Sequence, residues 1–294
     1  MSFFLSLVIA GLCVGSAYAL VAVGLNFTFW TTKTLNFGQG SVMMLCAVTT
    51  ALLMAGGTAK IVSIVAALAL VALVGVIVER VAVRPALKTA GSMGWVIATL
   101  GFGILLQGIT AKMFGSQAIA FPEVIFRAQD SITLFGQNVS LQYATVFVTS
   151  VSLILILEFL MRHTILGSAV RAISQDTELG TVQGLPVGLI ISGSFVASSI
   201  LAGVAGILIA QISGTVDPAF GFELVLFGFV AAVLGGMGSS YGALVGGLIV
   251  GVIGKLVGGY VSTAAEHSIA FALLILMLAL RPEGFFGRRE VGKA

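Results

Sequence analysis

The sequence predicts an all-α polytopic membrane protein with eight or nine transmembrane helices, one or two of them broken or re-entrant. Hydrophobic residues make up 59% of the 294-residue chain and charged residues only 9%, and the mean hydropathy is +1.16. Globular soluble chains carry about 25% charged residues, so too few are present here to cover a water-exposed surface. Glycine is in excess, with 38 residues, which is nearly twice the usual ~7%. The composition therefore excludes a soluble domain. The glycine excess indicates that many glycines have a structural or functional role.

Nine apolar segments follow one another along residues 1–294, which we treat as a single transmembrane domain. A helix needs about 20 apolar residues to cross a hydrocarbon layer of roughly 30 Å. The five prolines all fall in the expected connections, where they interrupt no helix. The predicted segments are Phe3–Leu25, Ser41–Ala55, Ile61–Val78, Trp95–Ala111, Leu141–Leu160, Val187–Gln211, Glu223–Leu234, Ala243–Val257 and Ala264–Leu280.

Two of these segments are short for a crossing, and each adjoins a glycine-rich stretch. Ser41–Ala55 follows Asn36-Phe37-Gly38-Gln39-Gly40, and Glu223–Leu234 precedes Gly235-Gly236-Met237-Gly238-Ser239-Ser240. Non-helical backbone survives at membrane depth only where protein or a watery cavity satisfies it. Both stretches are therefore predicted to be breaks in helices or re-entrant turns.

Further glycines recur four residues apart, a spacing that lets two helix backbones approach closely in lipid. The favoured interpretation is ordinary helix packing. The alternative is that residues 235–259 form an interface that shifts between two packings during transport. The pairs are Gly11/Gly15, Gly242/Gly246, Gly247/Gly251 and Gly254/Gly258.

Basic residues gather in three connecting segments, which the positive-inside rule assigns to the cytoplasm. The loop 112–140 balances its few basic residues with acidic ones and is predicted to be external, as is 212–222. Nine crossings would place the N-terminus outside and eight would place it inside, whereas the C-terminus is cytoplasmic either way. The three basic segments contain Arg80, Arg84 and Lys88; Arg162 and Arg171 in the loop 161–186; and Arg281, Arg288, Arg289 and Lys293.

The sequence contains no recognisable catalytic or metal-binding cluster. His163 and His267 lack a partner at metal-ligand spacing, and no phosphate-binding P-loop is present. We therefore expect no bound cofactor and no catalytic residue. Every acidic residue lies at a segment end or in a loop, which argues against a proton path, although backbone carbonyls at a broken helix remain able to hold sodium. The modest net charge of +3 is scattered, so nucleic acid is not an expected partner.

The cytoplasmic loop 161–186 contains signals for a short helix. Ser174 or Asp176 would cap it, Glu178 would occupy its first turn, and Gly184 with Pro186 would end it. One face would carry the apolar residues Leu179, Val182 and Leu185. The residues alone leave two interpretations open, because such a helix can lie on the membrane surface or dock into the groove of a partner.

The spacing from Glu178 to Gly184 resembles the EAA loop of ABC importer permeases, with Leu179-Gly180 where that motif prefers two alanines. Four phrases, one of them the EAA loop from Arg171-Ala172-Ile173-Ser174-Gln175-Asp176 onward, resemble the LivH-type permeases of branched-chain amino acid importers. The other three are Asn36-Phe37-Gly38-Gln39-Gly40, where the family has a phrase like N-F-A-H-G; Val233–Ser239 with Gly242; and Arg281–Arg289. The four phrases occur in the family's order over nearly the whole chain. Gln39 replaces the usual histidine, and this departure leaves the substrate open.

The resemblance implies half of a two-permease pore in a bacterial inner membrane. Its partners would be a second, LivM-type permease, two ATPase subunits that carry ATP and Mg²⁺, and an external solute-binding protein. The substrates would be branched-chain or related hydrophobic amino acids; urea or short amides are the alternative, and a stand-alone secondary transporter or channel is the rival class. The implied ATPase-coupling residues are Gln175, Asp176, Thr177, Glu178, Leu179, Gly180 and Gly184.

For the translocation path, the two glycine-rich breaks supply the candidates, since polar groups and irregular backbone meet there. A moderately polar path suffices if the binding protein provides selectivity. The alternative is that these residues only support the backbone of the broken helices. The candidate residues are Asn36, Gln39, Gly235, Gly236 and Ser239.

Overall fold

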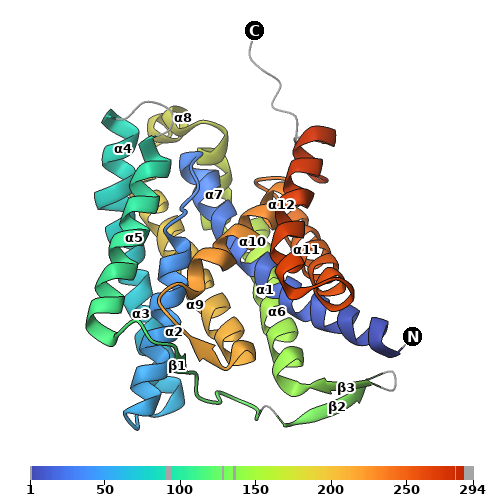
Figure 1. Ribbon diagram of the computed structural model, residues 1–294. Coiled ribbons are helices and arrows are strands. Elements are labelled where there is room, and N and C mark those ends of the chain that lie inside the picture. The colour runs from blue at the N-terminus through green and yellow to red at the C-terminus, as the bar shows by residue number, and fades with distance from the viewer. Residues whose placement is uncertain (1, 90–93, 128, 135–136, 282, 288–294) are drawn as a thin grey trace.

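The first helix, α1 (Ser2–Thr32), passes through a bundle formed by the other long helices (Figure 1). The computed structural model describes residues 2–89, 94–127, 129–134, 137–281 and 283–287, so Arg288, Arg289 and Lys293 of the basic tail lie outside the described residues. The other helices are α2 (Gln39–Ala55), α3 (Lys60–Ile77), the π-helical η1 (Val78–Val83), α4 (Arg84–Thr89), α5 (Gly94–Phe114), α6 (Leu141–His163), α7 (Ile165–Gln175), α8 (Thr177–Val182), α9 (Val187–Ser213), α10 (Phe220–Gly235), α11 (Ser240–Tyr260) and α12 (Thr263–Leu280).

Seven helices within the described ranges are long and apolar enough to cross a membrane, and α2 and α10 are shorter, at 17 and 16 residues. This confirms the predicted class, an all-α polytopic membrane protein. It also confirms that the short segments are the two that adjoin the glycine-rich stretches. Large apolar side chains point outward from α3, α5, α6 and α12, as expected for surfaces that face lipid.

The predicted external loop and the basic segments lie at opposite ends of the bundle (Figure 1). The loop 112–140 contains the strands β1 (Ile119–Ala120), β2 (Ser131–Leu134) and β3 (Gln137–Ser140). Strand β1 pairs antiparallel with β4 (Thr215–Val216), which follows α9, and β2 pairs with β3. The helices α4, α7 and α8 and the C-terminal end of α12 lie at the other end (Figure 1).

The segment after α3 differs from its predicted loop structure. The chain stays helical through η1 and α4, so Arg80, Arg84 and Lys88 lie on helices, and Pro85 lies in the first turn of α4. Proline has no N–H to donate within this continuous helix, and it stands where π-helical hydrogen bonding gives way to α-helical hydrogen bonding. Glu79 in η1 is only 2% exposed, and its carboxylate accepts hydrogen bonds from Arg84 Nε (2.9 Å) and Ser192 Oγ (3.0 Å).

Glycines bring α1 and α11 into backbone contact. A Cβ atom placed on Gly15 would lie 2.6 Å from the Gly247 carbonyl oxygen, and one on Gly247 would lie 2.5 Å from the Ala19 nitrogen. Gly11 faces Val252 in the same way, at 2.6 Å from its Cα. These distances confirm that the spaced glycines serve close helix packing. Because lipid provides little hydrophobic force between helices, such close contact is a main source of association.

One glycine pair has a different role from the predicted one. Gly254 and Gly258 on α11 face a side chain, that of Glu266 on α12, where a Cβ on Gly258 would lie 2.7 Å from Oε2. The two glycines therefore make room for a carboxylate between the helices. The glycine spacing alone does not indicate this role, because it does not identify what lies opposite each glycine.

We expect Gly247→Ala to destabilise the protein by about 1–3 kcal/mol, because the added methyl forces α1 and α11 apart. Gly108→Ala is the matched control, since a Cβ there has nothing within 4 Å and removal of a helical glycine gains about 0.5–1 kcal/mol. Thermal melting of the two purified variants in detergent measures the difference. Equal melting temperatures would contradict the packing argument.

Candidate functional site

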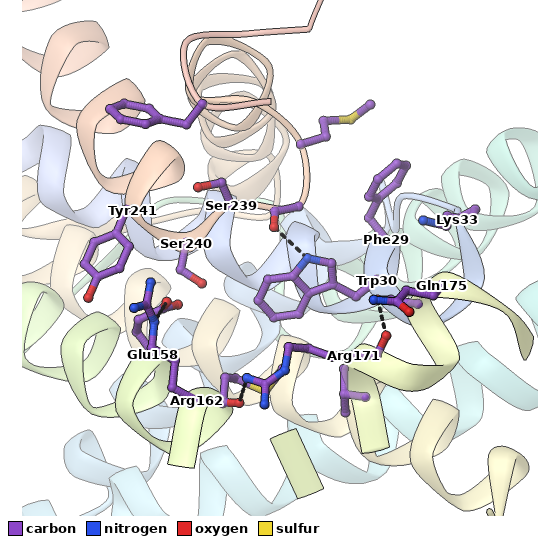
Figure 2. A pocket seen from close by; sticks show the side chains of 16 residues that line it. Phe29, Trp30, Lys33, Glu158, Arg162, Arg171, Gln175, Ser239, Ser240 and Tyr241 are labelled. Carbon is purple, nitrogen blue, oxygen red and sulfur yellow. Dashed lines mark hydrogen bonds and ion pairs between the residues drawn. The ribbon is translucent and has the colours of Figure 1, made fainter. Parts of the chain in front are cut away.

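Two side chains of α1 hold the break between α10 and α11. Asn26 Oδ1 accepts a hydrogen bond from the Gly238 nitrogen (3.1 Å), and Asn26 Nδ2 donates one to the Ser239 carbonyl (3.3 Å). Trp30 Nε1 donates to the Gly238 carbonyl at 2.8 Å (Figure 2). Gly236 and Gly238 have φ angles of +96° and +88°, in the left-handed region that favours glycine. The break is thus a defined structure built from glycine and fixed by α1.

The chain after α12 completes this break. The Phe285 nitrogen donates to the Leu234 carbonyl (2.9 Å) and the Phe286 nitrogen to the Gly235 carbonyl (3.0 Å). The last carbonyls of a helix have no intrahelical partner, so this segment caps the C-terminal end of α10. Two of the phrases that the sequence singled out, 233–239 and 281–289, therefore contact each other over the described part of the second.

A cavity of about 860 Å³ lies beside the break, between the C-terminal ends of α1 and α6, helix α7 and the start of α11 (Figure 2). Both Ser239, a predicted path residue, and Gln175, a predicted coupling residue, line this cavity. The labelled side chains around it are Phe29, Trp30, Lys33, Glu158, Arg162, Arg171, Gln175, Ser239, Ser240 and Tyr241 (Figure 2).

The cavity has more cationic than anionic groups. Arg162 Nε pairs with Glu158 Oε1 at 2.7 Å, and the Arg162 guanidinium lies 5.0 Å from the centre of the Tyr241 ring. Lys33 lies over the Phe29 ring, and Arg171 donates to the Met161 carbonyl and to Ser168 Oγ. Three cations face one carboxylate, so the surroundings favour polar or negatively charged groups. Among the described residues, no His, Cys, Asp and Glu side chains form a group that could hold a metal ion.

The loop 161–186 folds into two helices, although the sequence predicted one. The missed helix, α7, begins after Thr164, whose Oγ1 accepts a hydrogen bond from the Gly167 nitrogen (3.1 Å). Its inner face buries Ala169, Val170 and Ile173. The signal was available in the sequence, as a Thr cap followed by apolar residues three and four apart.

The second helix, α8, agrees with the predicted helix at both ends. Asp176 precedes it, with its carbonyl accepting from the Gly180 nitrogen (3.1 Å), and the chain leaves it through Gly184, at φ +78°. Asp176 and Thr177 line a neighbouring cavity of about 370 Å³ that also contains Lys33. Gly180 is buried against Ile173. Only the backbone of Glu178 and Leu179 is described.

The other two predicted path residues lie apart from the break. Asn36 is 1% exposed, close to Gly38 and α5, and the fully buried Gln39 packs on Gly24 of α1, with Nε2 3.4 Å from the Val21 carbonyl. Residues 24 and 26 of a helix point in nearly opposite directions, so Gln39 and the break contact opposite faces of α1. Within the described chain, neither amide atom of Asn36 nor Gln39 Oε1 has a hydrogen-bond partner.

The fold and the site define a multi-pass membrane protein with a solute-sized cavity at the end that carries its basic segments. Comparison with known proteins gives its family. Residues 7–280 match the model described as the permease component of the branched-chain amino acid transport system. The chain belongs to this family.

Named relatives span almost the whole chain. The high-affinity branched-chain amino acid transport system permease protein LivH of Salmonella typhimurium is 33% identical, over 99% of this chain and 98% of the relative. BraD of Pseudomonas aeruginosa, described in the same words, is 32% identical, over 99% and 98%. A solved structure, PsaBC from Streptococcus pneumoniae in complex with Fab, has a TM-score of 0.53 at 13% identity and covers 97% of this chain and 94% of its own. That likeness concerns the fold alone.

Asn26→Leu should destabilise the permease by about 1–3 kcal/mol, because the Gly238 nitrogen loses the Asn26 acceptor in a partly buried place, and the Ser239 carbonyl keeps only its bond from the Ala243 nitrogen. Thr28→Val in the same helix is the control. Thr28 is also fully buried, but its hydroxyl bonds only to the Leu25 carbonyl within the helix. Thermal melting in detergent compares them. A smaller loss for Asn26→Leu than for Thr28→Val would show that α1 does not hold the break.

Proposed function

We propose that this chain is a pore-forming permease subunit of an ATP-driven importer, and that it supplies half of the pore for branched-chain or related hydrophobic amino acids. The observation that carries the proposal is the single cavity shared by Gln175, at the end of α7, and the break held by Trp30. A displacement of α7 alters the wall of a cavity whose opposite wall is a non-helical segment of the bundle. Family membership and the relatives' names favour amino acids over urea or short amides.

The coupling surface in this proposal is the α7–α8 segment, with Gln175, Asp176, Thr177, Glu178, Leu179, Gly180 and Gly184 seated in a groove of an ATPase subunit. Exposed apolar side chains support docking here, since Val182 on α8 is 84% exposed and Ile165 on α7 is 89% exposed. Short helices with apolar anchors are a common way to bind a partner's groove. Closure of two ATPases around ATP and Mg²⁺ would then move α7 against α1.

The remaining partners follow from the same proposal. A second, LivM-type permease completes the pore, and an external solute-binding protein delivers the amino acid at the end that carries the strands. By the positive-inside rule, the end with α4, α7 and α8 is cytoplasmic, and so is the C-terminus, in a bacterial inner membrane. For the solute path we propose Asn36, Gln39, Gly235, Gly236 and Ser239. The buried amide of Asn36 and the buried Oε1 of Gln39, which have no hydrogen-bond partner among the described residues, support it.

Glu178→Lys tests the coupling surface. We expect ATP-driven leucine uptake in proteoliposomes to fall at least about tenfold, because reversing a charge at a docked helix costs on the order of 1.4 kcal/mol or more, while membrane insertion is unchanged. Glu178→Asp, which keeps the negative charge at the same position, is the matched control and should transport normally. Normal uptake by Glu178→Lys would count against ATPase docking at α8.

Single introduced cysteines test the proposed residues of the solute path. Cys13 and Cys46 are buried, so a water-soluble maleimide should label the introduced cysteines selectively. We expect Ser239→Cys to react readily at rest, because Ser239 lines the cavity. Asn36→Cys and Gln39→Cys should react only while ATP-driven transport is under way. Labelling of these two that is equally slow with and without turnover would remove them from the path.

A further inference from the structure

A second cavity, of about 380 Å³, lies at the end of the bundle that carries β4. It is lined by residues of α1, α6, α9, α10, α11 and α12 and of the chain that leads into α10. Its inner wall is apolar, with Val14 and Tyr18 from α1 and Leu224 and Phe227 from α10, all of them buried. Tyr18 and Phe227 stack with their ring centres 4.8 Å apart and their planes 14° apart.

The rest of the wall is charged. Lys255 Nζ pairs with Glu266 Oε1 at 2.6 Å, and these side chains are 29% and 16% exposed. Asp217 and Glu223 also line the cavity, and Asp217 is fixed by a hydrogen bond from the Ala219 nitrogen to its Oδ1 (2.7 Å). The space that holds the Glu266 carboxylate exists because Gly258 has no side chain. One ammonium and three carboxylates therefore share this wall.

This combination of walls fits a particular chemistry. The volume falls within the roughly 300–1,000 Å³ of small-molecule sites, which combine an apolar lining with a few polar groups. An aliphatic side chain would contact Val14, Leu224 and the aromatic pair. The ammonium group of a zwitterion would face the carboxylates, and its carboxylate would face Lys255. Urea lacks the apolar part, and an anionic solute would face three carboxylates against one ammonium.

We propose that this cavity is a binding site for aliphatic zwitterionic amino acids, occupied after the solute enters the permease and before it reaches the break between α10 and α11. The proposal rests on the proposed import function and assigns a substrate site to residues that the sequence did not single out. Four charged side chains orient the solute: the paired Lys255 and Glu266, and the carboxylates of Asp217 and Glu223. The Tyr18–Phe227 stack closes the inner end of the cavity.

The experiment uses Ser213→Cys in the purified full-length permease complex in detergent, without the solute-binding protein. Ser213 lines the cavity and is exposed. L-leucine should slow maleimide labelling about tenfold when its concentration is about ten times Kd. The deaminated acid and the decarboxylated amine of leucine should each protect much less. Ser116→Cys is the control, because Ser116 is exposed before β1 and does not line the cavity; leucine should leave its labelling unchanged.

A second variant tests the charged wall. Glu223→Gln should raise the leucine concentration needed for half-protection about tenfold, as expected for a charge-assisted contact, whereas Glu123→Gln should have no effect. If leucine fails to protect Ser213→Cys in a preparation that imports leucine with ATP after reconstitution, the cavity assignment is overturned and the import function stands. Protection by leucine without ATP-driven import would support the cavity and overturn the import function. Equal protection by leucine, the amine and the acid would also overturn the assignment.

Discussion

The close contact of α1 with α11 is the constraint from which the rest of the arrangement follows. In lipid, helices associate through packing, and the glycines at 15 and 247 let the two backbones touch. This contact makes α1 the buried axis of the bundle, with Leu20, Val21 and Val23 fully shielded. Because other helices surround α1, its different faces contact different parts of the protein. One face of α1 holds the break through Asn26 and Trp30, and the opposite face carries Gly24, which seats Gln39.

The break between α10 and α11 connects the parts of the protein that the import proposal requires to move together. Its backbone is held by two side chains of α1 and capped by the segment after α12, so no regular helix crosses it. Hydrogen bonds of this kind can be exchanged as neighbouring helices shift, whereas the glycine contacts of α1 and α11 resist separation. Helix α7 touches the same cavity through Gln175. A rigid α1 beside hydrogen bonds that can be exchanged is a physical basis for coupling a movement of α7 to a change at the break.

The two cavities differ in charge and lie toward opposite ends of the bundle. The one near α7 has an excess of cations, whereas the one near β4 has an excess of carboxylates around the Lys255–Glu266 pair. Between them α1 is fully buried. A solute with both charges can interact with each cavity in turn, first through its ammonium group and then through its carboxylate. Eight of the 25 charged residues line these two cavities, while the outer helix surfaces are apolar.

The sequence by itself determined the membrane class, the nine apolar segments and the two that are too short, because lipid imposes length and composition on each segment separately. Local signals also predicted the ends of α8. The sequence did not reveal that the helix continues past Pro85, that 233–239 meets the tail, or that Gly258 seats Glu266. Nor did it place Lys255 beside Tyr18 and Phe227 in one cavity. The tertiary structure decided these features, because each depends on which residues lie opposite one another after the helices pack, and no local pattern encodes that choice.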